Sequence, residues 1–99
     1  MDRFDDIRGW AEARNLIEGS DARAQMLKLA EEMGELAGAL ARNKQSEAWD
    51  AIGDMVVVLT ILSEQLGVSI ERCIDSAWLE IKDRKGRMVN GVFIREGGE

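Results

Sequence analysis

Residues 28–36 read Lys28-Leu29-Ala30-Glu31-Glu32-Met33-Gly34-Glu35-Leu36 and contain a first acidic group. A second acidic group follows at Glu47, Asp50 and Asp54. Both groups lie in segments whose apolar spacing predicts an amphipathic or buried helix. A carboxylate in such a segment is unfavourable unless a positive group binds it. Carboxylates that converge from two helices therefore predict a divalent cation site, and oxygen ligands of this kind suit magnesium.

The spacing of the acids places them at the border of the core. With a rotation of about 100° per residue, the first helix carries an acidic stripe beside an apolar face. The stripe holds Gln25, Lys28, Glu32 and Glu35 with Glu31 at its edge, and the apolar face holds Met26, Leu29, Met33, Leu36 and Leu40. On the next helix the acidic stripe continues into Val57 and Ile61, so those acids also point toward the core. If the two helices pack antiparallel through a short connection, the acidic groups face one another.

The whole chain is predicted to be all-α, a bundle of about four helices with a short C-terminal hairpin or arm. Apolar spacing predicts helices over residues 4–16, about 21–42, 46–66 and from 70 to near 86, and the absence of proline favours this interpretation. Asn90-Gly91 stands between two short apolar runs, which indicates a tight hairpin or an extended arm. We therefore expect a helical domain over residues 1–86 and an arm over 87–99. The predicted helix ends are Asp2, Ser20 or Asp21, Asn43, Gly67 and Ser69.

Composition limits the partners and the compartment. The chain has 99 residues and a net charge of −6, so its overall field does not attract nucleic acid or anionic lipid. Cys73 is the single cysteine, which excludes an internal disulfide, fits a reducing compartment, and is expected to be buried. We find no secretory leader, and the longest apolar run, residues 55–62, is too short to span a bilayer. A cytoplasmic protein is expected, and a domain this small would bury more apolar surface by pairing with another chain.

A solvated helix face is the ordinary explanation of a Glu-Glu-x-x-Glu run. Asp54 argues against it, because this residue directly precedes the apolar run 55–59, which is expected to be buried. Lys28 is placed to pair with Glu32 across one helical turn, which neutralises one acid but leaves the others without a positive partner.

With these residues the chain resembles the MazG-like nucleoside triphosphate pyrophosphohydrolases, especially the small single-domain forms of phages and mobile elements. The motif of that family is Glu-Glu-x-x-Glu on one helix and Glu-x-x-Asp on the next. Here the first part is complete at Glu31, Glu32 and Glu35, and the second part reads Asp50-Ala51-Ile52-Gly53-Asp54. The resemblance extends from Ile7-Arg8-Gly9-Trp10 to Ile81-Lys82-Asp83-Arg84-Lys85-Gly86.

One position departs from the family motif. The family glutamate falls on Ala51, which cannot bind metal, and either Asp50 or Glu47 is placed to substitute for it. The resemblance implies a metal-binding set of Glu32, Glu35, Asp50 and Asp54, in which Glu32, Glu35 and Asp54 form the centre. Glu31 joins Glu32, Glu35 and Asp54 in the implied catalytic set, as the acceptor of a proton from water.

The activity that the resemblance implies is hydrolysis of ribo- or deoxyribonucleoside triphosphates to the monophosphate and pyrophosphate, with Mg²⁺ or, as a substitute, Mn²⁺. It also implies a homodimer or homotetramer with shared sites. An anionic substrate requires cations, so we predict substrate binding by Lys28, Lys82, Arg84 and Lys85, although a basic helix end is also favoured by the helix dipole alone. Trp10 is placed to stack on a base and Asn90 to bind a phosphate or sugar. Core or subunit packing is the more common role of Trp10, Trp49 and Trp78, and turn formation that of Asn90.

Three alternatives accompany this hypothesis. A non-catalytic helical oligomerisation or binding module of the same fold would follow from the loss of the ligand at Ala51. A di-iron carboxylate bundle is set aside, because such sites use histidine and the chain has none. The phosphoribosyl-ATP pyrophosphohydrolases are near relatives of the same fold and fit the motif context less well.

Overall fold

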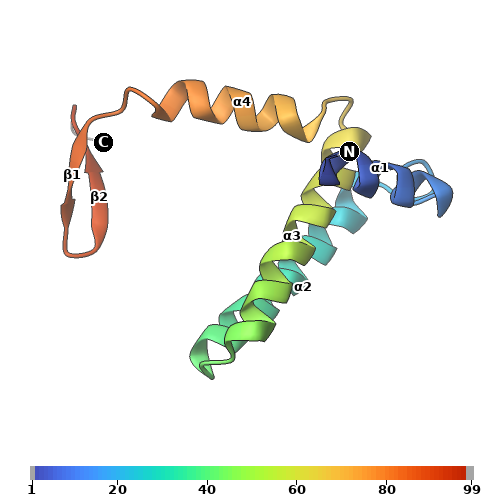
Figure 1. The fold of residues 1–99 in the computed structure, drawn as a ribbon, viewed down its shortest axis with the longest axis horizontal. Helices are drawn as coiled ribbons and strands as arrows, with labels where there is room; N and C mark the ends of the chain where they lie inside the picture. Colours follow the sequence, from blue (N-terminus) through green and yellow to red (C-terminus); the bar gives the residue numbers. More distant parts are fainter. Residues whose placement is uncertain (1, 98–99) are drawn as a thin grey trace.

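A computed structural model describes residues 2–97, in which four helices precede a two-stranded hairpin (Figure 1). The helices are α1 (Arg3–Ala13), α2 (Ala22–Ala41), α3 (Gln45–Gln65) and α4 (Ile70–Ile81), and the strands are β1 (Gly86–Val89) and β2 (Val92–Arg95). This arrangement confirms the all-α prediction with a short C-terminal hairpin. Met1, Gly98 and Glu99, which belong to the predicted segments 1–86 and 87–99, lie outside the described residues.

Local signals set most helix ends. The Asp21 side chain accepts a hydrogen bond from the Ala24 N–H at 2.8 Å, and Ser69 Oγ accepts one from the Arg72 N–H at 3.1 Å. These caps satisfy N–H groups that have no partner inside the helix. Asp2 caps α1 in the same way, while Asn43 and Gly67, which follow the C-cap residues of α2 and α3, take positive φ values.

Two predicted helix ends were wrong. Helix α1 stops at Ala13 instead of Leu16, because Asn15 adopts a left-handed conformation with φ of 56°, which a continuing helix does not allow. Helix α4 stops at Ile81 instead of near Gly86. The chain must leave the helix there because Gly86 already pairs with Arg95 in the hairpin.

The C-terminal segment is a hairpin, which resolves the choice between a hairpin and an extended arm. Val89 pairs with Val92, and the two residues between them, Asn90 and Gly91, have φ values of 51° and 80°. Two positive φ values at these positions define a type I′ turn, whose twist matches that of the flanking strands. Turn formation therefore accounts for Asn90.

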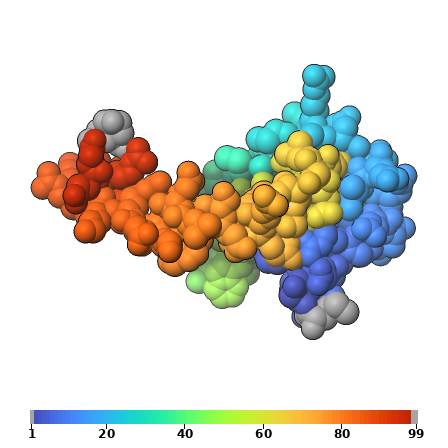
Figure 2. Space-filling model, turned by 90° about the horizontal axis from the view of Figure 1, so that it is seen from above, coloured from blue at the N-terminus to red at the C-terminus, as the bar shows by residue number. Residues whose placement is uncertain are grey.

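Helices α2 and α3 lie antiparallel side by side, and α1 packs against the end of α3 (Figure 1). Helix α4 leaves α3 at a bend of 102°, and together with the hairpin it projects from the rest of the molecule (Figure 2). No single helix among residues 2–97 has the length and apolar composition to cross a membrane, and α3 and α4 meet that test only as a bent pair.

The single chain is extended for its size. Its radius of gyration is 16.3 Å, whereas a compact chain of this length has about 13 Å. Its accessible surface is 7546 Å², whereas a compact monomer of this mass exposes roughly 5,600 Å². The arm formed by α4 and the hairpin accounts for much of this shape, since none of its residues is buried.

The core is narrow and lies mainly between α2 and α3. Alanines allow the two backbones to approach closely, and the buried apolar residues are Ala11, Leu29, Ala39, Ala48, Ala51, Val58 and Ile61. Several residues expected inside are exposed in the single chain, because α4 projects from the rest of the molecule and contributes no buried residue. The expectation that Cys73 is buried was wrong. Trp10, Trp49 and Trp78 are exposed in the single chain, so the core is not where they pack, and subunit packing stays a prediction for them.

Candidate metal and substrate site

The predicted acids of α2 and α3 meet in one cleft between the two helices. The cleft has a volume of about 660 Å³ and is lined by Glu31, Gly34, Glu35, Gly38, Arg42, Glu47, Asp50, Ala51 and Asp54. The acids converge because α2 and α3 are antiparallel and their connection is short, as the sequence predicts. Small residues on the cleft side of α2 leave room between the helices.

Two acids of the cleft lining, Glu35 and Asp54, form a tight group with Glu32 of α2, which lies beside the lining and is not part of it. Glu32, Glu35 and Asp54 each offer a carboxylate oxygen, and these oxygens all lie within 4.8 Å of one another. Glu32 is only 4 % exposed, and its Oε2 atom is buried without a hydrogen-bond partner. Because an unpartnered buried carboxylate oxygen is strongly unfavourable, the group has the composition and the unsatisfied atom that a hard cation would complete.

The electrostatics of Glu32 point the same way. The neighbouring Glu35 carboxyl raises the pKa of Glu32 above its ordinary value, chiefly because the two carboxyl groups lie close enough to share a proton, and burial and then the like charge of Glu35 add to this shift. Lys28 opposes this shift, since its Nζ lies 3.6 Å from Glu32 Oε1 and 3.7 Å from Glu31 Oε2. Pairing of Lys28 with Glu32 is thus confirmed, yet it leaves Glu32 Oε2 without a partner.

One physical expectation for the second acidic group was wrong. Asp54 was expected to be buried beside an apolar run, but Asp54 is exposed, and of residues 55–59 only Val58 is buried in the single chain. The buried acid is Glu32 on α2, because the side of α2 that carries it faces α3. Burial therefore disfavours an unpaired carboxylate at Glu32 and not at Asp54.

The candidates to replace the ligand missing at Ala51 both line the cleft. Asp50 and Glu47 face it from α3, but neither belongs to the group of three carboxylates whose oxygens lie within 4.8 Å. Ala51 itself is buried in the wall of the cleft. Glu47 is engaged with Arg42, whose Nη2 lies 3.1 Å from Glu47 Oε1.

Most of the predicted substrate-binding residues lie elsewhere in the single chain. Lys82, Arg84 and Lys85 follow α4, and Asn90 is in the turn of the hairpin, on the arm that projects away from α2 and α3 (Figure 1). Trp10 is on α1, where the Arg14 guanidinium carbon lies 4.7 Å from the ring centroid. Of the predicted cations, Lys28 alone contacts the acidic group of α2 among the described residues.

Arg42 is a cleft residue that the sequence analysis missed. A signal for it exists, because Arg42 follows Glu35 by seven residues and therefore shares its face of the helix after two turns. Gly38 lies between them on that face. The sequence prediction gave this positive charge near the last turn of α2 no role in the site.

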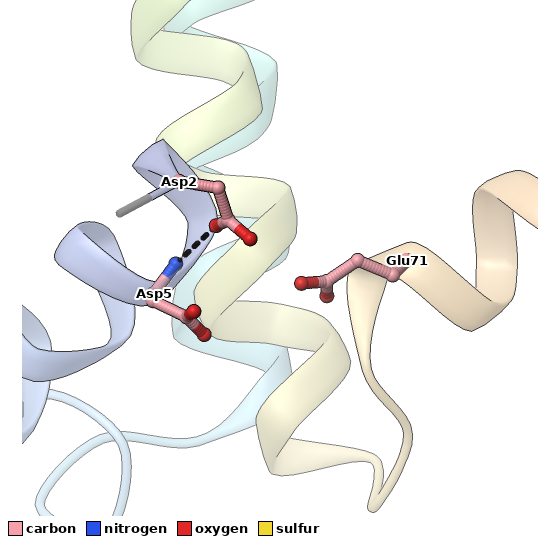
Figure 3. Close-up of side chains that lie close together, drawn as sticks. All are labelled: Asp2, Asp5 and Glu71. Carbon is pink, nitrogen blue, oxygen red and sulfur yellow. Dashed lines mark hydrogen bonds between the residues drawn. The ribbon is translucent and has the colours of Figure 1, made fainter.

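A third acidic group lies where α1 meets α4. Asp2, Asp5 and Glu71 bring carboxylate oxygens together, and Asp2 caps α1 through the Asp5 N–H (Figure 3). Arg8 explains this group, since its guanidinium donates to both oxygens of Glu71 at 2.7 Å and also to Asp5. Asp5 and Glu71 thus share a cation of the same chain, and Arg8 acts as a clamp between α1 and the start of α4.

Sequence comparison relates this chain to one protein family and to one phage protein. The sequence model of one family, phosphoribosyl-ATP pyrophosphohydrolase, matches residues 13–78. A protein described as "Uncharacterized 18.2 kDa protein in rep-hol intergenic region" of Haemophilus phage HP1 (strain HP1c1) is 49 % identical over 59 residues. That match covers 60 % of this chain and 36 % of the phage protein, so the chain spans about a third of the length of this relative. No solved structure gives a significant match.

The matched segment contains the whole cleft. Residues 13–78 include α2, α3 and most of α4, and hence every acid discussed for the metal site, together with Lys28 and Arg42. The hairpin, Trp10 and the basic residues after α4 fall outside the match. The match to this family therefore covers the helices that form the cleft.

Proposed function

This chain belongs to the phosphoribosyl-ATP pyrophosphohydrolase family, and on that basis we propose that it hydrolyses nucleoside triphosphates to the monophosphate and pyrophosphate with Mg²⁺ as cofactor. The family implies a pyrophosphohydrolase, a hydrolase of acid anhydrides, and is in the same superfamily as the MazG-like enzymes that the sequence resembles. One observation carries the proposal, namely the buried, unpartnered Oε2 of Glu32 within a group of three carboxylates.

The residues at the cleft fit a hard divalent cation. Glu32, Glu35 and Asp54 would hold Mg²⁺, or Mn²⁺ in its place, with Asp50 as a further ligand on the same side of α3. When bound, the cation offsets phosphate charge and lowers the pKa of a coordinated water. The donor set is all oxygen, which disfavours the softer metals that prefer nitrogen or sulfur ligands.

The remaining groups have roles in proton transfer and charge balance. In the proposed reaction a water oxygen bonds to one phosphorus of the anhydride, the bond to the bridging oxygen breaks, and pyrophosphate leaves. Glu31 lines the cleft, and its carboxylate is exposed to water, so it accepts the proton of the attacking water. Lys28 bridges Glu31 and Glu32 and balances part of their charge.

Phosphoribosyl-ATP is a second candidate substrate, because the matching family is described by that activity. It contains the same triphosphate chain and the same anhydride bond as a nucleoside triphosphate, so the same carboxylates would serve both substrates. The shape of the pocket beyond the phosphates distinguishes nucleoside triphosphates from phosphoribosyl-ATP. Both kinds of substrate are therefore needed to test the activity.

We further propose that the chain acts in the cytoplasm as a homodimer or homotetramer. The surface of 7546 Å² exceeds that of a compact monomer by nearly 2,000 Å², which is on the scale that obligate interfaces bury. Helix α4 has twelve residues, exposes Ile74, Trp78 and Ile81, and is too short to be stable in water without a covering surface. Sedimentation of Trp78→Glu tests this: we expect dissociation, and an unchanged oligomer would contradict the role of α4.

The activity is tested by pyrophosphate release from ribo- and deoxyribonucleoside triphosphates and phosphoribosyl-ATP, with and without Mg²⁺. We expect Mg²⁺-dependent release that is lost in Asp54→Asn and retained in Asp75→Asn, a matched change at an exposed aspartate of α4. Asp54 is exposed, so its substitution does not disturb the core. Absence of release from every substrate, with an intact fold, would instead identify a non-catalytic binding module.

A further inference from the structure

Arg42 occupies an unusual electrostatic position. It follows the last residue of α2, and it is the one basic side chain among the described residues that line the acidic cleft. All the other charged residues of the lining are acids: Glu31, Glu35, Glu47, Asp50 and Asp54. A cation fixed beside the carboxylates that are proposed to hold metal is placed to meet the anionic part of a metal-bound substrate.

Gly38 gives the Arg42 side chain its direction. A Cβ atom added at Gly38 would lie 3.1 Å from Arg42 Nη1, and Arg42 is the one neighbour outside the local backbone that it would approach. The guanidinium therefore lies along α2, over the space that a side chain at Gly38 would fill. Glycine inside a helix is unfavourable, and at Gly38 the missing Cβ leaves the space in which the Arg42 guanidinium lies.

Glu47 holds the guanidinium by a contact that is easily exchanged. The distance from Arg42 Nη2 to Glu47 Oε1 is 3.1 Å, and both side chains are more than half exposed. Exposed ion pairs contribute little to stability. A phosphate group, in contrast, offers a guanidinium two parallel charge-assisted hydrogen bonds.

We propose that Arg42 is a substrate-binding residue that exchanges Glu47 for a phosphate group of the substrate, and that Gly38 positions it for this exchange. The inference rests on the proposed function and extends it by naming a phosphate-binding group of this chain. Within a single chain, Arg42 supplies at the cleft the cation that the predicted lysines and arginine after α4 do not bring there.

Steady-state kinetics of pyrophosphate release test the inference, with Arg42→Ala and Arg42→Lys as variants. Loss of a charge-assisted contact to phosphate predicts a KM raised about 10-fold in Arg42→Ala with kcat changed less than about twofold. Arg42→Lys keeps the charge, and its KM is expected to lie between those of the wild-type protein and Arg42→Ala. Arg23→Ala is the matched control, because Arg23 is an exposed arginine near the opposite end of α2. Equal KM values for Arg42→Ala and Arg23→Ala would overturn the inference.

Gly38→Ala tests the positioning role with Arg42 retained. We expect KM to rise severalfold while the melting temperature stays equal or increases, because alanine is the better helix former. In the double variant Gly38→Ala/Arg42→Ala, the change at position 38 is expected to add nothing to KM, since Gly38 acts through Arg42. Independent, multiplicative effects of the two changes would overturn the positioning role.

Calorimetric titration of inorganic pyrophosphate into the protein with Mg²⁺ separates this inference from the proposed function. If the wild-type protein hydrolyses nucleotides and Arg42→Ala binds pyrophosphate as tightly as the wild-type protein, the proposed role of Arg42 is wrong and the proposed function stands. If no nucleotide is hydrolysed, the function fails. Weaker pyrophosphate binding by Arg42→Ala than by Arg23→Ala would then still support the role of Arg42 in phosphate binding. Equal or undetectable binding by both variants would overturn that role.

Discussion

Magnesium is expected to stabilise this protein against heat, and the effect depends on the group of three carboxylates between α2 and α3. Glu32, Glu35 and Asp54 lie within 4.8 Å of one another, and Glu32 Oε2 is buried without a partner. This arrangement is unfavourable in the free folded chain and absent in the unfolded chain. A cation that binds only the folded state therefore shifts unfolding to higher temperature.

The size of the effect follows from binding linkage. At a Mg²⁺ concentration 100 times the dissociation constant, the free energy of unfolding rises by about 2.7 kcal/mol. For a domain of this length each kcal/mol raises the melting temperature by roughly 4–8 °C, so an increase of at least about 10 °C is expected. Asp54→Asn removes one of the three carboxylates while preserving size. If this weakens binding about 10-fold, a loss typical even of residues that only support metal ligands, the stabilisation at the same Mg²⁺ concentration falls to about 1.4 kcal/mol.

Thermal unfolding followed by circular dichroism at constant ionic strength measures this effect. Constant ionic strength is required because the chain carries a net charge of −6, and any salt screens its self-repulsion. The control is Asp75→Asn, which removes the same charge from α4 outside the cleft. The reasoning is refuted if NaCl stabilises the wild-type protein as much as MgCl₂ does, or if both variants lose the Mg²⁺ response equally.

Two further outcomes are expected from local contacts. Arg8 lowers the pKa of Glu71 to about 2 by hydrogen bonding to its carboxylate, so the pair stabilises the fold fully above the ordinary pKa of glutamate and loses this contribution as pH falls toward 2. The melting temperatures of wild type and Glu71→Gln should thus differ at pH 7 and converge near pH 2; a difference independent of pH would contradict the clamp. The other acids facing Arg8 are Asp5 and Glu64. Asp21→Ala, which removes the N-cap of α2, should lower stability by about 1 kcal/mol and the melting temperature by roughly 4–8 °C, and an unchanged melting curve would show that another group caps the helix.

Sequence reasoning was most successful where the cause is local. The caps at Asp21 and Ser69, the stop at Gly67 and the Asn90-Gly91 turn each depend on a few neighbouring backbone atoms, and the structure has all of them. The two wrong helix ends had causes of a different kind. Asn15 adopts a left-handed conformation, in which asparagine is enriched, and the end of α4 is set by strand pairing, which helical periodicity does not detect.

For the candidate site, the sequence placed the acids on facing sides of two helices, and the structure brings Glu32, Glu35 and Asp54 together. Their roles as ligands and catalysts remain predictions. Periodicity did not establish which acid is buried, because burial depends on how the helix rotates against its neighbour. The result was the reverse of the expectation, with Glu32 buried and Asp54 exposed.

Four helices, most of their caps, a turn at Asn90-Gly91 and the two acidic stripes follow from the sequence alone, since each depends on interactions within a few residues. Only the tertiary structure decided that Arg8 clamps Glu71 across 63 positions, that α4 projects from α3, and that Arg42 joins the acids in the cleft. These features depend on the relative placement of whole helices. That placement is set by the sum of many weak side-chain contacts between distant segments, which a local pattern does not encode.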